Sequence, residues 1–125
     1  MLAGIDVRDS HHKEAALLAQ RLAGRRLVAT NHVRGESWTW LRRKRWHAKA
    51  VELLDALRPG ASNVSIDFLS ESLEAEALDW LRRHDEREYS FVDATSFAYM
   101  RARGITDALA FDGDFAAAGF TELRP

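Results

Sequence analysis

Hydrophobic residues recur along this chain with two spacings, and the two kinds of segment alternate. Apolar positions three or four residues apart predict helices, whereas short apolar or alternating runs predict strands. The predicted helices cover residues 10–24, 31–44, 46–57, 70–84, 90–104 and 115–118, and the predicted strands cover residues 27–29, 64–68, 107–111 and 120–123. Strands separated by helices of this length favour a parallel sheet covered on both faces. The pattern therefore predicts a single three-layer α/β/α domain over residues 1–125.

The first nine residues give no comparable signal. Met1–Asp9 is short, mostly apolar and then acidic, and it does not predict a strand. Ser10 is a suitable N-cap for the helix that follows, and Gly24 is a natural stop for that helix. The first predicted strand of the sheet is therefore the run that begins at Leu27.

Composition removes several classes of function. Apolar residues make up 46% of the 125 residues and charged residues 30%, which is ordinary for a globular domain. The sequence has neither an apolar run of the ~20 residues that span a bilayer nor a signal-peptide pattern, so we expect a cytoplasmic protein without membrane contact. The absence of cysteine excludes disulfides, thiolate zinc sites and cysteine nucleophiles. The net charge of −1 gives no general attraction to nucleic acid, so any RNA binding must use a local basic patch.

Acidic residues stand at two places where an α/β domain would hold a metal ion. Asp93 lies in the first turn of the predicted helix 90–104, and Asp112 and Asp114 lie just past the predicted strand 107–111. In an open parallel sheet the carboxyl ends of the strands and the amino ends of the helices lie at the same end of the domain. The side chains of these acids can therefore converge there. Clustered carboxylates suit Mg²⁺ or Mn²⁺, and such an ion can activate water for phosphodiester hydrolysis.

Each acid also has a structural explanation. An acid three residues after Ser90 matches a capping box, and Asp93 complements the helix dipole at that position. Asp112 can cap the short helix that follows it, and Glu36 can be a solvated residue at the edge of an apolar helix face. The sequence holds no zinc-type His/Glu spacing, GxSxG elbow, phosphate-binding glycine loop or dinucleotide fingerprint. The acids taken together therefore remain the best candidates for chemistry.

Two segments of the chain resemble the PIN domain, the nuclease fold of VapC-type toxins from bacterial toxin–antitoxin pairs. They are DSHHKEAALLAQRLAGRRLVATNHVRGESWTWLRR and YSFVDATSFAYMRARGITDALAFDGDFAAAGF. The resemblance implies that Glu36 is the glutamate which the family carries on the helix after its second strand. It also implies that Asp93 opens the later helix as a metal ligand, and that Asp112 is the acid of the D-x-x-F motif, with Asp114 as a neighbouring ligand.

The same resemblance implies the function. The chain would be a Mg²⁺- or Mn²⁺-dependent endoribonuclease that hydrolyses RNA with metal-activated water, and Glu36, Asp93 and Asp112 would be its catalytic acids. A cognate antitoxin would cover the site, and the chain would form a homodimer. Two alternatives stay open: a PIN relative that binds RNA or antitoxin without cleaving, and a structural interaction domain whose acids are caps and solvated charges.

The chain departs from the family at its N-terminus. PIN domains begin with a strand that ends in an aspartate ligand, and Met1 aligns within the helix after this strand. The resemblance therefore predicts a parallel sheet that lacks its usual first strand, and Asp6 and Asp9 do not replace the missing acid. A start codon placed too far downstream, a truncated inactive relative, or a strand supplied by a partner would each explain the loss.

Basic and aromatic residues near position 40 are further candidates for RNA contacts. The cationic run consists of Arg42, Arg43, Lys44 and Arg45. These side chains can follow an RNA backbone, although cations at a helix C-terminus are also commonly solvated. Trp38 and Trp40 cannot share one helix face, so we expect one in the core and the other at a dimer or antitoxin interface. Stacking of Trp40 on an RNA base is a further possibility, since it lies one turn beyond Glu36.

Overall fold

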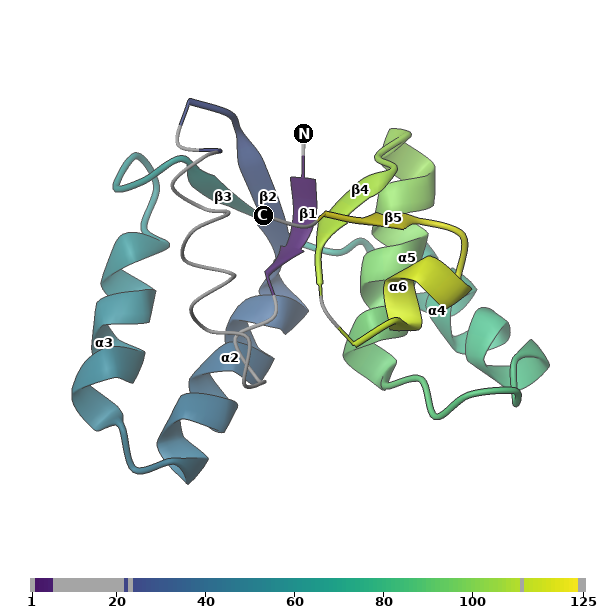
Figure 1. Cartoon of the computed structure of the whole chain (residues 1–125), viewed down its shortest axis with the longest axis horizontal. Helices are drawn as coiled ribbons and strands as arrows, with labels where there is room; N and C mark the ends of the chain where they lie inside the picture. The colour runs from purple at the N-terminus through teal and green to yellow at the C-terminus, as the bar shows by residue number, and fades with distance from the viewer. Residues whose placement is uncertain (1, 6–21, 23, 111, 124–125) are drawn as a thin grey trace.

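A five-stranded parallel sheet forms the centre of the molecule, in a computed structural model that describes residues 2–5, 22, 24–110 and 112–123. Its strands are β1 (Leu2–Ile5), β2 (Leu27–Thr30), β3 (Val64–Asp67), β4 (Asp107–Leu109) and β5 (Thr121–Glu122). The helices are α2 (Asn31–Arg43), α3 (His47–Ala56), α4 (Glu71–Arg83), α5 (Phe91–Arg103) and α6 (Asp114–Ala117), as Figure 1 shows. The predicted α/β class with a parallel sheet is therefore confirmed. No helix of the described ranges is long and apolar enough to cross a membrane.

The predicted elements and the observed ones agree closely where the structure describes the chain. Each helix and strand predicted after residue 26 is present, and only its ends are shifted. The predicted helix 10–24 lies almost entirely outside the described residues. The same holds for the layer that this helix would add to the sheet.

The N-terminal residues supply the central strand, which corrects the prediction that the sheet lacks it. β1 pairs in parallel with β2 on one side and with β4 on the other; Leu2 lies opposite both Leu27 and Asp107. Backbone pairing on both sides stabilises a strand even where its sequence, here Leu-Ala-Gly-Ile, has little intrinsic preference for one. Asp6 directly follows β1 in the sequence. It was set aside as a ligand because the first strand was expected to be missing, and that reason no longer holds. Asp6 and Asp9 themselves lie outside the described residues.

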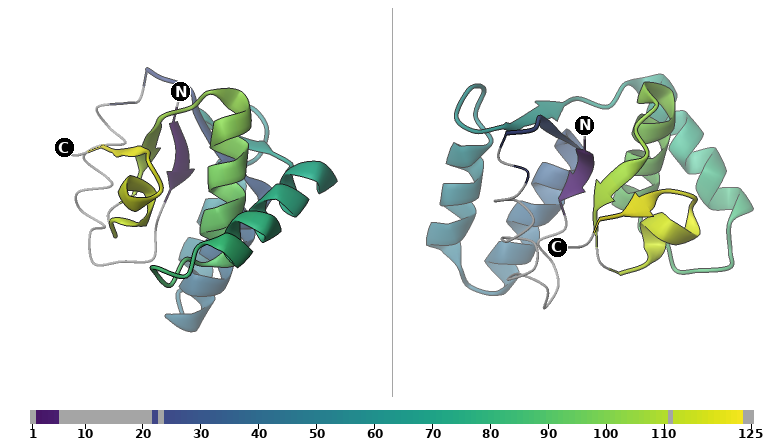
Figure 2. Two further views of the ribbon diagram at one scale, coloured as in Figure 1. Left: turned by 90° about the vertical axis from the view of Figure 1, so that its right-hand side faces the viewer. Right: turned by 45° about the horizontal axis from the view of Figure 1, so that its top comes forward.

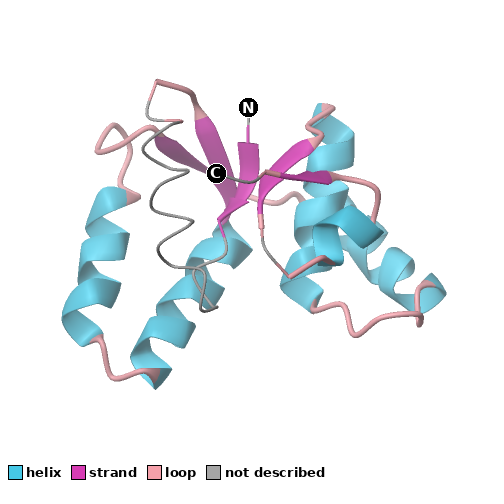
Figure 3. Cartoon of the chain, viewed as in Figure 1, coloured by secondary structure: helices cyan, strands magenta, loops and turns pink. Residues whose placement is uncertain are grey.

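The strand order β3-β2-β1-β4-β5 creates a switch point between β1 and β4. From β1 the chain builds outward through β2 to β3, and it then crosses back to add β4 and β5 on the other side. Ligands of open α/β sheets bind outside the strand carboxyl ends at such a point. The colouring by secondary structure in Figure 3 shows how the helices diverge from this end of the sheet into two groups, α2 with α3 and α4 with α5.

Helix α5 forms the main part of the core. Every residue from Asp93 to Met100 is buried, and the side chain of Phe97 is completely enclosed. Helix α4 packs along α5, and Figure 2 shows both helices on the same side of the sheet. The hydroxyl of Ser90 accepts a hydrogen bond from the Asp93 amide, and Gly104, with φ of 67°, ends the helix in the left-handed conformation. The helix is therefore fixed at both ends, which fixes the position of Asp93.

Candidate metal centre

Three carboxylates from two separate segments meet near the carboxyl end of β4. One oxygen each from Asp93, Asp112 and Asp114 lies within 4.8 Å of the others. Asp93 comes from the first turn of α5, whereas Asp112 lies in the turn between β4 and α6 and Asp114 is the first residue of α6. The predicted convergence of these three acids is thus present in the structure.

Asp93 is the buried member of this cluster, with 4% of its surface exposed. The N-cap of α5 is the Ser90 hydroxyl, so the predicted capping role belongs to that serine. A buried carboxylate beside two further acids is costly unless a cation or hydrogen-bond donors compensate its charge. Its burial within 4.8 Å of two further carboxylates makes Asp93 a candidate metal ligand.

The turn that carries Asp112 and Asp114 is held by its own hydrogen bonds. The Asp114 amide donates to the Asp112 Oδ1 at 3.1 Å, but the N-cap of α6 is Gly113, so Asp112 closes the turn before the helix and does not have the predicted capping role. Gly113 has φ of 86°, a left-handed conformation that glycine adopts readily. Phe115 is buried directly after the turn and anchors it to the core. This arrangement explains how an exposed aspartate can have a fixed position.

Two residues that the sequence did not single out complete the support of this turn. Glu122 of β5 accepts hydrogen bonds from the amides of Gly113 at 3.3 Å and Ala116 at 3.1 Å. Arg87, in the connector between α4 and α5, donates to Asp114 Oδ1 through Nε at 3.0 Å and contacts the same oxygen through its Nη2 at 2.9 Å. The hydrogen bond to Asp114 raises the pKa of Arg87 above its ordinary value. No local motif marks either residue, because their partners lie 6 to 27 positions away in the sequence.

The contact with Arg87 separates the role of the exposed Asp112 from that of the half-buried Asp114. One oxygen of Asp114 is already engaged by a guanidinium, and Arg87 Nη2 also reaches the main-chain carbonyl of Asp112 at 3.4 Å. Asp93 and Asp112 are therefore the stronger candidates for direct metal ligands. Asp114 holds Arg87 beside the cluster and keeps one carboxylate oxygen near the other two acids.

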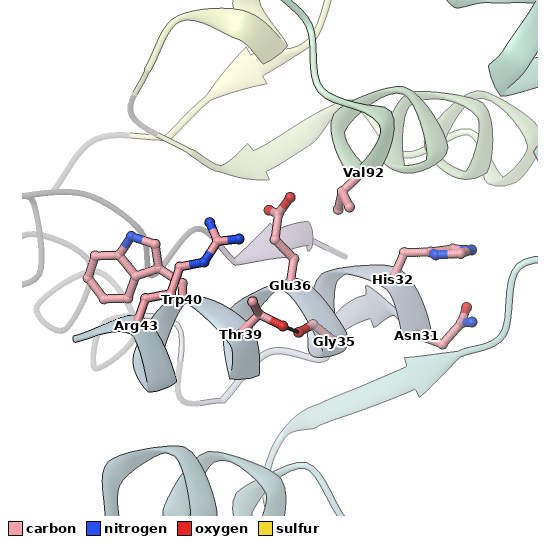
Figure 4. A pocket seen from close by; sticks show the side chains of 8 residues that line it. All are labelled: Asn31, His32, Gly35, Glu36, Thr39, Trp40, Arg43 and Val92. Atoms are coloured by element: carbon pink, nitrogen blue, oxygen red, sulfur yellow. Dashed lines mark hydrogen bonds between the residues drawn. The ribbon is translucent and has the colours of Figure 1, made fainter. Parts of the chain in front are cut away.

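Glu36 lies on the wall of an adjoining pocket of about 620 Å³ rather than within the group of three carboxylates. The pocket is lined mainly by α2, and Val92, the neighbour of Asp93 in the sequence, contributes to it from α5. Figure 4 shows the Glu36 carboxylate pointing from α2 toward the side where Val92 lies. The two helices pack against each other, and His32 meets Phe91 with ring centroids 5.3 Å apart. Glu36 and Val92, the residue before Asp93, thus line one pocket from two different helices.

The cationic run is only partly associated with this pocket. Its four side chains, Arg42, Arg43, Lys44 and Arg45, are all exposed. Arg43 lines the pocket, and the Lys44 ammonium lies 5.4 Å from the ring centre of Trp40. Trp40 lines the pocket, whereas Trp38 contacts His47 of α3. The two tryptophans therefore have different surroundings, as predicted, but both are half-buried and neither belongs to the core, which corrects the expectation that one of them packs there.

The donor set of the cluster suits a hard divalent cation. Its possible ligands are carboxylate oxygens, which Mg²⁺ and Mn²⁺ prefer, and no sulfur ligand is present because the chain has no cysteine. Such sites commonly involve one or two carboxylates, with waters and substrate phosphate completing the shell. The cluster therefore has the chemistry of a metal centre for phosphate esters.

The fold and the acids together define a known class of domain. A sequence model of the PIN domain matches residues 2–121, and the chain belongs to the PIN domain family. It is 54% identical, over 99 residues, to the 23S rRNA-specific endonuclease VapC20 from two strains of Mycobacterium tuberculosis, which covers 79% of this chain and 74% of the relative. The crystal structure of Mycobacterium tuberculosis VapC20, described as a toxin that cleaves the sarcin–ricin loop, matches with a TM-score of 0.81 and 48% identity. That match covers 96% of this chain and 90% of the other.

Proposed function

We propose that this chain is a divalent-metal-dependent endoribonuclease and the toxin component of a toxin–antitoxin pair. The observation that supports this most directly is the meeting of the Asp93, Asp112 and Asp114 carboxylates at the carboxyl end of the sheet. The relatives that are named as 23S rRNA endonucleases make RNA the substrate class and ribosomal RNA the first candidate. Because ribosomal RNA is cytoplasmic in bacteria, the chain would act in the cytoplasm.

Each of the four acids would have a different role in binding Mg²⁺ or Mn²⁺. Asp93 and Asp112 would bind the ion directly, Glu36 would reach it directly or through water, and Asp114 would contribute its remaining oxygen while holding Arg87. When bound, the ion supplies a Lewis acid for the phosphate and lowers the pKa of water. The chain itself positions the RNA strand, and no protein nucleophile is required. Arg87 and Arg43 would offset the charge of the phosphates on either side.

The partners follow from the same site. A cognate antitoxin would inhibit the enzyme by covering the acids and the adjoining pocket. A homodimer is proposed by analogy with the family, since the PIN fold commonly functions as a pair of chains. The runner-up function, a PIN relative that binds RNA without cleaving it, keeps the same surfaces and differs only in catalysis.

Manganese titration and RNA cleavage test the proposal together. Saturating Mn²⁺, at 100 times its dissociation constant, should stabilise the chain by about 2.7 kcal/mol and raise Tm by roughly 5–15 °C. A ribosomal RNA fragment should be cut in Mn²⁺ or Mg²⁺ and remain intact in EDTA. Stabilisation by Mn²⁺ without cleavage of any ribosomal or synthetic RNA would instead support the non-cleaving relative. Failure of both measurements would leave only the structural role.

Asp6 provides a separate test, because it follows the central strand in the sequence. If Asp6 is a further metal ligand, Asp6→Asn should reduce cleavage at least about tenfold and weaken the Mn²⁺-dependent rise in Tm. Asp9→Asn, a change of the same kind three positions later, serves as the matched control and should retain wild-type activity. Equal activity of the two variants would show that the acids of the centre come from the later segments alone.

A further inference from the structure

The pocket lined by Glu36 also contains an aromatic side chain, Trp40, to which the proposed metal chemistry gives no role. Glu36, Trp40 and Arg43 lie at positions i, i+4 and i+7 of α2, so they share one face of the helix. All three line the same pocket of about 620 Å³. Figure 4 shows the Glu36 carboxylate and the Arg43 guanidinium on the same side of α2, with the Trp40 ring beside Arg43 and Val92 on the far side of Glu36. The pocket therefore combines a carboxylate with an indole and a guanidinium, and Val92, which precedes Asp93 in the sequence, lines it from α5.

The turn after α2 holds the indole of Trp40 in place. Arg45 adopts φ of 62°, a left-handed conformation that is uncommon for residues other than glycine, and the Trp46 amide donates to the Leu41 carbonyl at 3.0 Å. This sharp reversal places the Trp46 ring 6.0 Å from the Trp40 ring, in an edge-to-face arrangement. The Lys44 ammonium lies 5.4 Å from the same Trp40 ring. Neighbours on the turn thus fix the orientation of Trp40, which lowers the entropy lost when a planar ligand stacks on it.

An aromatic ring next to an arginine suits a particular feature of RNA. Unpaired bases stack on aromatic side chains, and arginine binds the phosphates that connect them. Bases within a helix do not expose their faces, so such a platform selects single-stranded or looped segments. The cluster of acids alone gives no such preference, because every phosphodiester presents the same charged group.

We propose that this pocket binds an unpaired nucleobase next to the scissile phosphate, with the base stacked on Trp40 and Arg43 holding an adjacent phosphate. The proposal rests on the ribonuclease function and adds the residues that would recognise the substrate: Trp40 for one unpaired base and Arg43 for the phosphate beside it. Glu36 then lies between the bound base and the metal centre.

Binding of a short single-stranded RNA, measured by fluorescence anisotropy with Ca²⁺ in place of Mg²⁺, tests the platform. Trp40→Ala should weaken binding by roughly 5- to 150-fold, the loss expected when one base loses its stacking partner. Trp40→Phe should recover most of the affinity, because a smaller ring still stacks. Trp38→Ala is the matched control: it lies on the same helix, contacts His47 of α3, and should bind as the wild type does.

Abasic RNA separates stacking from any change in folding. A series of oligonucleotides, each lacking one base, should show one position whose loss weakens binding to the wild-type chain and leaves binding to Trp40→Ala unchanged. Such coupling between one base and one side chain does not arise from a general loss of structure. If the wild type cleaves RNA but every abasic position affects both chains equally, the platform is overturned and the ribonuclease stands. If the wild type neither binds nor cleaves RNA, both proposals are overturned.

Discussion

Replacement of Asp112 by asparagine is expected to reduce RNA cleavage by about 10²–10³-fold, because a metal ligand that stabilises charge in the transition state contributes several kcal/mol. The fold should survive this change. An asparagine Oδ1 can still accept the hydrogen bond that the Asp114 amide donates to Asp112, so the turn before α6 keeps its geometry. Cleavage rates at saturating Mn²⁺ and circular dichroism of both proteins provide the measurement.

Asp107 is the matched control for Asp112. Asp107 lies at the amino end of β4, whereas Asp112 follows its carboxyl end, so the two acids lie at opposite ends of the same strand. Asp107→Asn removes the same charge from the chain and should leave cleavage within about twofold of the wild type. Equal losses in both variants would show that total charge, rather than a metal site, controls activity.

The metal-free proteins give an additional comparison. Three carboxylates within 4.8 Å of one another repel when no cation is bound, and Arg87 compensates part of that charge through Asp114. Asp112→Asn relieves some of this repulsion, so its Tm in EDTA should equal or exceed that of the wild type. Its Tm should no longer rise with Mn²⁺. A residue whose only role was to cap the short helix would show the opposite pattern, namely a lower Tm in EDTA and an unchanged response to Mn²⁺.

Residues of the site were predictable from the sequence where local chemistry marked them. Asp93 follows a capping serine at the start of a strongly patterned helix, and Asp112 and Asp114 follow a buried strand. Their convergence followed from the general rule that the carboxyl ends of parallel strands and the amino ends of the helices lie at the same end of an open α/β sheet. Glu36 is less directly placed, because its position depends on how α2 packs against α5, and hydrophobic spacing does not specify that angle.

Residues that depend on distant partners were missed. Arg87 belongs to a polar connector, and only the folded structure brings its guanidinium to Asp114. Glu122 caps the amides of Gly113 and Ala116 across the β4–β5 segment. The central strand β1 was missed for a related reason: four residues with an internal glycine give a weak signal by themselves, and their stability comes from pairing with β2 and β4. In each case the information lies in the assembled sheet rather than in the local sequence.

The aromatic core is what holds Asp93 in position, and its loss should have the largest effect on stability. Phe97 lies one turn after Asp93, is fully buried, and meets Phe115 at 4.8 Å and Trp80 at 5.1 Å between ring centroids. Through Phe115, the ring connects α5 to the helical turn that follows Asp112. One buried side chain therefore joins the two segments that supply the metal ligands.

Phe97→Ala is expected to reduce the free energy of unfolding by about 3–5 kcal/mol, the usual cost of emptying a large aromatic site. Because domains of this size are stable by only ~5–15 kcal/mol, Tm should fall by roughly 10–20 °C. Phe68→Ala is the control: this ring is 70% exposed, and its loss should cost less than about 1 kcal/mol. Urea unfolding followed by circular dichroism measures both. Similar midpoints for the two variants would mean that Phe97 does not anchor α5, and the rigid placement of Asp93 would then need another cause.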